Sequence, residues 1–207
     1  IVCGVFSGFI IAAITCYRYL TFSSPNFDFG LFVNMFHNMK ETGLPLSTAE
    51  RDVLLSHFVV HISPIYYLLL PFYFIFPSPM TLQIGQAVVL ASGVIPVTLL
   101  CRHFKLSGKA TVLVTLIYAL YPALSAGCFY DIHENCFLTP LLLWTFYFFE
   151  REKYPFMYLF AFLTLMVKED AAIYIILFAL FVLLSRKKFF HGAVLMLGSL
   201  AYFGIAL

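Results

Sequence analysis

The sequence predicts an all-α, polytopic transmembrane helical bundle. Of its 207 residues, 62% are hydrophobic and only 11% carry a charge, whereas a soluble domain carries about 25% charged residues. The mean hydropathy is +0.96. We expect one transmembrane domain over 1–207, and because both chain ends fall inside apolar runs we expect a fragment of a longer protein. The net charge of +2 gives no reason to expect nucleic-acid binding.

Apolar segments of near-membrane length, about 20 residues each, predict about seven spans. In chain order they are 1–20, 80–101, 109–126, 136–150, 154–168, 170–185 and 189–207. Two of them, 136–150 and 154–168, are short, so we expect some crossing helices to extend beyond these limits. A further apolar piece, 58–76, contains Pro64 and Pro71, which suit a juxtamembrane or re-entrant helix.

The orientation follows from the Lys and Arg content of the short loops, because basic loops stay cytoplasmic. The basic loops are 101–109, 150–153 and 185–188. They alternate with three non-basic connections: the first extracytoplasmic loop 21–79, the second extracytoplasmic loop 127–135, and the KED motif at 168–170. The alternation holds only if 58–76 does not cross. We expect an integral protein of a bacterial-type plasma membrane.

Ionisable residues of the predicted outer face come from three separate segments. They are Asp28, then Asp131, His133 and Glu134, and then Lys168, Glu169 and Asp170. Such groups cost about 2.5–3.5 kcal/mol each at bilayer depth, so they are rare there and usually functional. The KED motif lies among strong helix formers rather than turn residues. We therefore expect its charges at a helix end, facing a polar cavity or pairing with each other.

Two interpretations of Asp28 stay open. The segment NFDFGLFVNMFHNM places Phe29, Phe32, Val33 and Phe36 on one helical face, which predicts an amphipathic helix lying in the membrane interface. Asp28 would lie at the N-terminus of that helix, where the dipole favours a carboxylate. It is either a cap or a functional acid.

His57 and His61 are four residues apart, which places them on one face of a helix. Such a pair can bind a metal ion or contact a phosphate, but two histidines alone are a weak signal. Together with Asp131, His133 and Glu134 they form a candidate cluster of histidines and carboxylates. In contrast, Glu41, Glu50, Arg51 and Asp52 fit an ordinary solvated loop.

The five cysteines form no zinc pattern. Cys128 and Cys136 bracket FYDIHEN on the predicted outer side, where an oxidising compartment permits a disulfide. Two unlinked thiols at helix ends are the alternative.

Four stretches carry a resemblance: FDFGLFVNMFHN, the segment from HFVVHISP to LLCRHF, YDIHENCFLTPLLL, and LMVKEDAAIYI. They resemble an uncharacterised family of predicted membrane proteins that is grouped with the GT-C glycosyltransferases, which use lipid-linked sugars. Their order is also similar to the dolichyl-phosphate-mannose-protein mannosyltransferase and aminoarabinose transferase group. There, an acid in the first outer loop precedes PPLYYLL-like, PSPLALRL-like and TKGP-like motifs. In this chain KED replaces Lys-Gly-Pro, and HISP has one proline where relatives have two.

The resemblance implies a GT-C fold that transfers a sugar from a polyprenyl-phosphate donor to an acceptor on the extracytoplasmic face, with membrane lipid as its surroundings. Transfer needs a base near the acceptor and a cation at the leaving phosphate. The implied catalytic acids are Asp28, Asp131 and Glu134, which in some members surround a divalent metal ion. The implied donor-phosphate contacts are Lys168, His57 and His61, supported by His133, Glu169 and Asp170.

Two other functions fit the same residues. Lys168, Glu169 and Asp170 could form the ion relay of a proton-coupled transporter. However, the acids lie at one face and no repeated halves are evident, unlike many transporters. A non-catalytic, lipid-binding scaffold of the same fold is the third interpretation.

Overall fold

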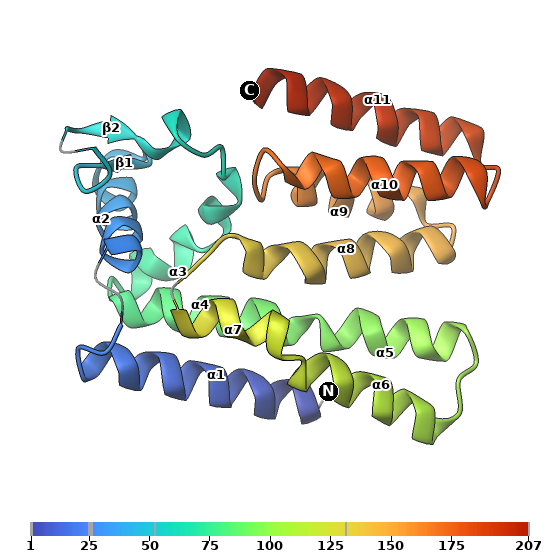
Figure 1. Cartoon of the computed structure of the whole chain (residues 1–207), viewed down its shortest axis with the longest axis horizontal. Coiled ribbons are helices and arrows are strands. Elements are labelled where there is room, and N and C mark those ends of the chain that lie inside the picture. Colours follow the sequence, from blue (N-terminus) through green and yellow to red (C-terminus); the bar gives the residue numbers. More distant parts are fainter. Residues whose placement is uncertain (1, 25–26, 52, 131, 207) are drawn as a thin grey trace.

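The computed structural model describes residues 2–24, 27–51, 53–130 and 132–206, although it leaves the side chains of residues 27, 28 and 130 undescribed. Apart from one small hairpin, the described elements are helices (Figure 1), which confirms the all-α class. The elements in chain order are α1 (Val2–Leu20), α2 (Phe27–Thr42), β1 (Leu46–Ser47), β2 (Leu55–Ser56), η1 (His57–Val59), η2 (Pro64–Leu68), α3 (Leu70–Ile75), α4 (Pro79–Ser92), α5 (Val94–His103), α6 (Gly108–Leu120), α7 (Pro122–Tyr130), α8 (Asn135–Glu150), α9 (Tyr154–Leu165), α10 (Ala171–Leu184) and α11 (Phe189–Ala206).

Four helical stretches in the described part of the chain are long and apolar enough to cross a membrane. They are Val2–Leu20, Pro79–His103, Gly108–Phe129 and Phe189–Ala206. The second joins α4 to α5, and the third joins α6 to α7. Shorter apolar helices, Tyr154–Leu165 and Ala171–Leu184, lie beside them. The structure therefore supports a polytopic bundle, while the count of seven spans stays a prediction.

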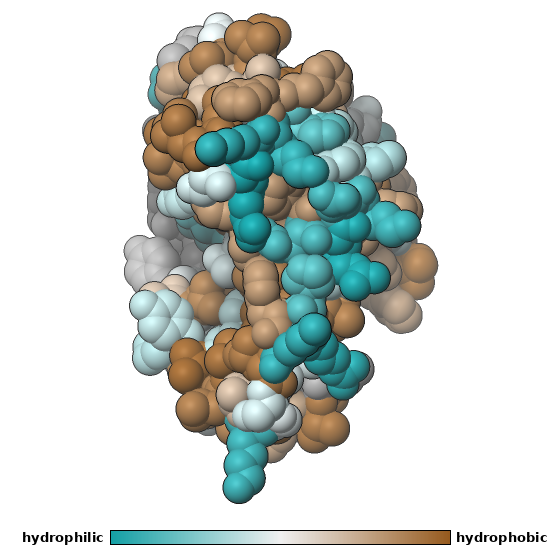
Figure 2. Space-filling model, turned by 90° about the vertical axis from the view of Figure 1, so that its right-hand side faces the viewer, coloured by the Kyte–Doolittle hydropathy of each residue, from teal (hydrophilic) through white to brown (hydrophobic). Residues whose placement is uncertain are grey.

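The three basic loops meet at one end of the bundle, on the right in Figure 1. The carboxylate of Glu150 bridges them, since it lies 3.8 Å from His103 and also accepts a hydrogen bond from Arg186. Lys188 donates to Glu152 at 2.8 Å in the same region. Figure 2 shows hydrophilic residues gathered on this end. Loops that are far apart in the sequence therefore form a single polar surface.

The opposite end carries the segment between α1 and α4 (Figure 1). Its elements are α2, the antiparallel hairpin β1–β2, and the short helices η1, η2 and α3. The longest helix within 58–76 is α3, with six residues. At about 1.5 Å per residue, a helix of that length cannot cross a bilayer.

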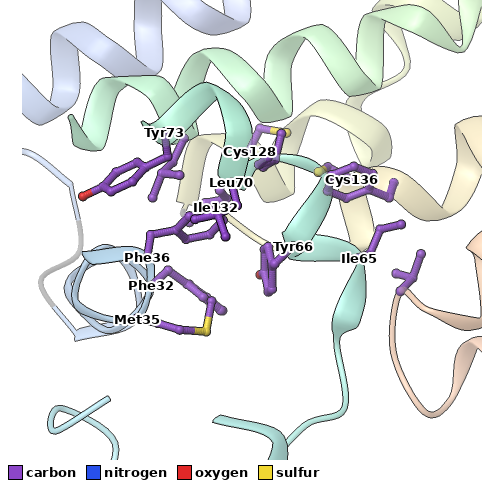
Figure 3. Packing of buried hydrophobic residues seen from close by; sticks show 14 of the residues in the cluster. Phe32, Met35, Phe36, Ile65, Tyr66, Leu70, Tyr73, Cys128, Ile132 and Cys136 are labelled. Atoms are coloured by element: carbon purple, nitrogen blue, oxygen red, sulfur yellow. The ribbon is translucent and has the colours of Figure 1, made fainter. Parts of the chain in front are cut away.

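The expected apolar face of the first-loop helix exists in α2, and it packs against protein. Phe32 and Phe36 point toward Tyr66 of η2 (Figure 3), with ring centroids 5.2 and 5.7 Å away. Phe36 also contacts Tyr73 of α3 at 5.5 Å. This aromatic contact holds α2 against η2 and α3, which belong to the same first loop.

Candidate functional site

Polar side chains from four loop regions meet at the end of the bundle that carries α2. They form what we call the polar cluster: Glu50, His57, His61, Tyr66, His133, Glu134, Lys168 and Glu169. The contributing regions are the β1–β2 connection, the segment from η1 to η2, the turn before α8, and the turn between α9 and α10. None of these regions lies inside one of the long helices, so the cluster can be polar without placing charge in the middle of a membrane-length helix.

Glu134 is the best-buried acid of the polar cluster, with 1% of its surface exposed. One carboxylate oxygen lies 3.3 Å from Nζ of Lys168, and the other accepts a hydrogen bond of 2.8 Å from the hydroxyl of Tyr66. Nδ1 of His133 lies 3.2 Å from the second oxygen, but outside hydrogen-bond geometry. Because Glu134 directly precedes α8, the helix dipole also favours its negative charge.

Glu169 ties the first loop to the turn between α9 and α10. Its carboxylate lies 2.9 Å from Nδ1 of His61 and accepts a hydrogen bond of 3.1 Å from the backbone N–H of Ile62. Next to it, the N–H of Ile65 donates to the carbonyl of Met166 at 2.9 Å. Burial acts to raise the pKa of Glu169, but hydrogen bonds from its own backbone, His61 and Ile62 outweigh it and lower the pKa below 4.5.

Glu50 and His57 form a second pair of carboxylate and imidazole, and this one is buried. The side chains are 9% and 3% exposed, and Nδ1 of His57 lies 3.2 Å from both carboxylate oxygens. The ring of His57 packs edge-on against Phe32, with its centroid 6.1 Å from that of His61. Its Nε2 atom is buried and has no hydrogen-bond partner.

A family model described as "Predicted membrane protein (DUF2079)" matches residues 18–207 of this chain. The chain belongs to this family. Neither a curated protein nor a solved structure matches it. Membership in this family and the apolar helical spans both indicate an integral membrane protein. The family description assigns no activity, so the DUF2079 match does not link the chain to GT-C enzymes.

The DUF2079 chain brings together most of the side chains that the sequence singled out. His57, His61, His133, Glu134, Lys168 and Glu169 all belong to the polar cluster. Asp28 lies in the first turn of α2, but its side chain is outside the described part of the chain, and Asp131 is outside the described residues altogether.

The KED motif of the DUF2079 chain does not act as one group of charges. We expected its residues to face one cavity or to pair with each other. Instead Lys168 contacts Glu134 and Glu169 contacts His61, while Asp170 is exposed at the start of α10. The reason is that the turn between α9 and α10 directs neighbouring side chains to different partner segments.

Two members of the polar cluster were missed by the sequence reasoning. Glu50 was expected to be an ordinary loop acid, yet it is largely buried against His57. Tyr66 belongs to the apolar piece 58–76, yet its hydroxyl donates a hydrogen bond to Glu134. The local sequence contains no signal for either contact, because the partner of Tyr66 is 68 residues away and the burial of Glu50 depends on the folded loop.

The predicted metal set of Asp28, Asp131 and Glu134 stays a prediction, because the side chains of Asp28 and Asp131 lie outside the described part of the chain. Glu134 is held by Tyr66 and Lys168, and in the described part of the chain no three His, Cys, Asp or Glu side chains are placed to hold a metal ion together. Cys128 and Cys136 are buried free thiols, so the structure contains the unlinked alternative rather than the disulfide.

Proposed function

We propose that this DUF2079 chain is a GT-C-type membrane glycosyltransferase that transfers a sugar from a polyprenyl-phosphate donor to an acceptor on the extracytoplasmic face. The observation that carries the proposal is the buried Glu134, held by Tyr66 and Lys168 next to the half-exposed His133. An ammonium group that a fixed carboxylate holds at a helix end can stabilise the negative charge that develops on the leaving lipid phosphate.

Lys168 is the residue we assign to the donor phosphate. Its side chain is 15% exposed, and Glu134 lies 3.3 Å from its Nζ atom. An ammonium group has three N–H donors, so contact with one carboxylate oxygen leaves donors for a phosphate oxygen. Glu134 then acts as a positioning residue that fixes the amine. Asp28 remains our candidate for the base that accepts the proton of the acceptor.

An apolar groove offers a place for the lipid part of the donor. It has a volume of about 570 Å³ and lies between α3 and α4, where Phe72, Phe76, Ile84 and Val88 line it. Its wall also includes Leu69, which follows closely on Tyr66 in the chain. A polyprenyl tail in this groove would therefore bring its phosphate toward the side chains that hold Glu134.

The test separates donor binding from chemistry. Undecaprenyl phosphate is titrated into purified protein, and transfer is followed with a radiolabelled polyprenyl-phosphate sugar. We expect Lys168→Gln to weaken binding of the phosphate at least about tenfold, as the loss of a charged hydrogen bond of about 1.5–3 kcal/mol implies. Asp28→Asn should retain binding and lose transfer, because it keeps the size and removes the base.

Lys109→Gln is the matched control, since this exposed lysine lies at the start of α6, at the opposite end of the bundle. Equal binding by Lys168→Gln and Lys109→Gln would remove Lys168 from the phosphate site. Full transfer by Asp28→Asn would remove Asp28 as the base. A transporter would instead show flux that depends on Glu169 and Asp170, but no contact among the described residues joins those charges and Lys168 into a relay.

A further inference from the structure

Two histidines of the polar cluster share one arrangement that sugar transfer does not require. Nδ1 of His57 lies 3.2 Å from the Glu50 carboxylate, and Nδ1 of His61 lies 2.9 Å from the Glu169 carboxylate. An imidazole that donates its Nδ1–H to a carboxylate presents a lone pair at Nε2. Histidines that ligate metal ions almost always have such a partner, which fixes the tautomer and raises the basicity of the ligating nitrogen.

The buried ring of His57 has a nitrogen atom that is available to a ligand. Its side chain is 3% exposed, and its Nε2 atom has no hydrogen-bond partner. A buried polar atom without a partner is unfavourable, and a metal ion bound to that nitrogen would remove the penalty. The side chain of His61 is 41% exposed, so an ion could approach from its side with water still attached.

The distance between the two rings suits a shared ion. Their centroids are 6.1 Å apart, with an angle of 65° between the ring planes. Two imidazoles on one ion have centroids roughly 5–6.5 Å apart when the metal–nitrogen bonds are about 2.0–2.1 Å long. A separation of 6.1 Å lies within this range, toward its upper end, so the distance between the rings is compatible with one shared ion.

The charge of the polar cluster favours a cation over an anion. Its members include three carboxylates, from Glu50, Glu134 and Glu169, and one ammonium group, from Lys168. With neutral histidines the cluster is therefore negative, and it attracts a divalent cation. Because the total charge of the cluster is already negative, the charge of Lys168 alone does not offset the negative charge of a bound phosphate group.

We propose that His57 and His61 bind one divalent transition-metal ion through their Nε2 atoms, with water oxygens completing the coordination. No third His, Cys, Asp or Glu in the described part of the chain joins them, so the ion keeps open positions, as catalytic metal ions do. Imidazole ligands suit zinc, copper, iron and nickel ions. One consequence rests on the proposed function: an open position would accept an oxygen of the donor phosphate and supply the missing positive charge.

Metal binding is measured directly. The purified full chain is stripped of metal with a chelator and titrated with Co²⁺, whose visible absorption reports nitrogen coordination, and then with Zn²⁺ in competition. We expect one ion per chain. His61→Gln should weaken binding by at least about tenfold, and Glu50→Gln by about 10–100-fold through its effect on His57. His61→Gln is the decisive variant, because its exposed side chain can be replaced without opening the core.

His103→Gln is the matched control. His103 also faces a glutamate, at 3.8 Å from Glu150, but it lies at the other end of the bundle, and its substitution should leave binding unchanged. Absence of stoichiometric binding, or equal affinity of His61→Gln and His103→Gln, would overturn the site. Undecaprenyl-phosphate binding is scored separately, so a metal site that persists while phosphate does not bind would contradict only the proposed function.

Discussion

At the scale of single residues, the contact between Glu134 and Lys168 places a cation beside a buried carboxylate. Glu134 is 1% exposed, whereas Lys168 retains some contact with solvent. A buried carboxylate that loses its cation is far less favourable than a neutral side chain of the same size. The pair therefore constrains which substitutions the cluster tolerates.

We predict that Lys168→Met lowers the free energy of unfolding by roughly 3 kcal/mol, the low end of the range for breaking a buried pair, because Tyr66 still donates to Glu134. The double variant Lys168→Met with Glu134→Gln should recover most of this loss. Reversible unfolding in mixed detergent measures both. A double variant as unstable as the single one would show that Glu134 does not depend on the charge of Lys168.

A second prediction at this scale concerns acid. The pKa of Glu169 lies below its ordinary value of 4.5 in the folded protein. Its contribution to stability is therefore fully present above pH 4.5 and is lost as the pH falls through the lowered, folded-state pKa. The melting temperature of the wild type should fall in that window, and Glu169→Gln should melt with a weaker dependence on pH there. Parallel curves for the two proteins would contradict the hydrogen bonds assigned to Glu169.

At the scale of elements, the junction between α4 and α5 depends on Gly93, because this residue has no side chain. A Cβ atom placed on Gly93 would lie 1.9 Å from the hydroxyl oxygen of Tyr118, and that hydroxyl donates to the carbonyl of Leu90 at 2.8 Å. The backbone of Gly93 is ordinary, with φ at −63°. Glycine is therefore required here for space, so that α6 can approach the junction.

We predict that Gly93→Ala destabilises the protein by about 1–3 kcal/mol, the usual effect of overpacking. Gly198→Ala in α11 is the control, because a Cβ there meets no atom within 4 Å, and alanine is a better helix former than glycine by about 1 kcal/mol. The two substitutions should therefore change the unfolding midpoint in opposite directions. A shift of the same sign would mean that Tyr118 moves aside without penalty.

At the scale of the whole molecule, polar residues occupy the two ends of the bundle and differ in kind. One end carries the basic loops that Glu150 bridges (Figure 2). The other end, which carries α2 (Figure 1), holds the polar cluster. Since basic loops stay cytoplasmic, the polar cluster should face the extracytoplasmic side.

We predict that single cysteines at Glu41 and Asp170, in a cysteine-free background, react with an impermeant thiol reagent in intact cells. Cysteines at Lys105 and Lys187 should react only after permeabilisation. All four positions are exposed, so access to water is equal and only the side of the membrane differs. Labelling of Lys105 from outside would reverse the orientation and exclude an extracytoplasmic site.

The sequence alone was sufficient for features that depend on neighbouring residues. Its hydropathy predicted a membrane protein with helical spans, its prolines predicted that 58–76 would not form a crossing helix, and its basic loops marked one end of the bundle. These features are local, because hydropathy and backbone preference act over a few turns of chain. The charges of the KED motif were likewise expected at a helix end.

Only the tertiary structure decided which side chains meet. His61 and Glu169 are 108 residues apart, and Tyr66 and Glu134 are 68 apart, so no local pattern could pair them. Packing of α2 against Tyr66 and Tyr73 folds the first loop onto itself, and Glu50 is buried with His57 inside the same loop. Hydropathy predicts that a segment avoids water, but a specific contact between distant side chains depends on how the helices pack.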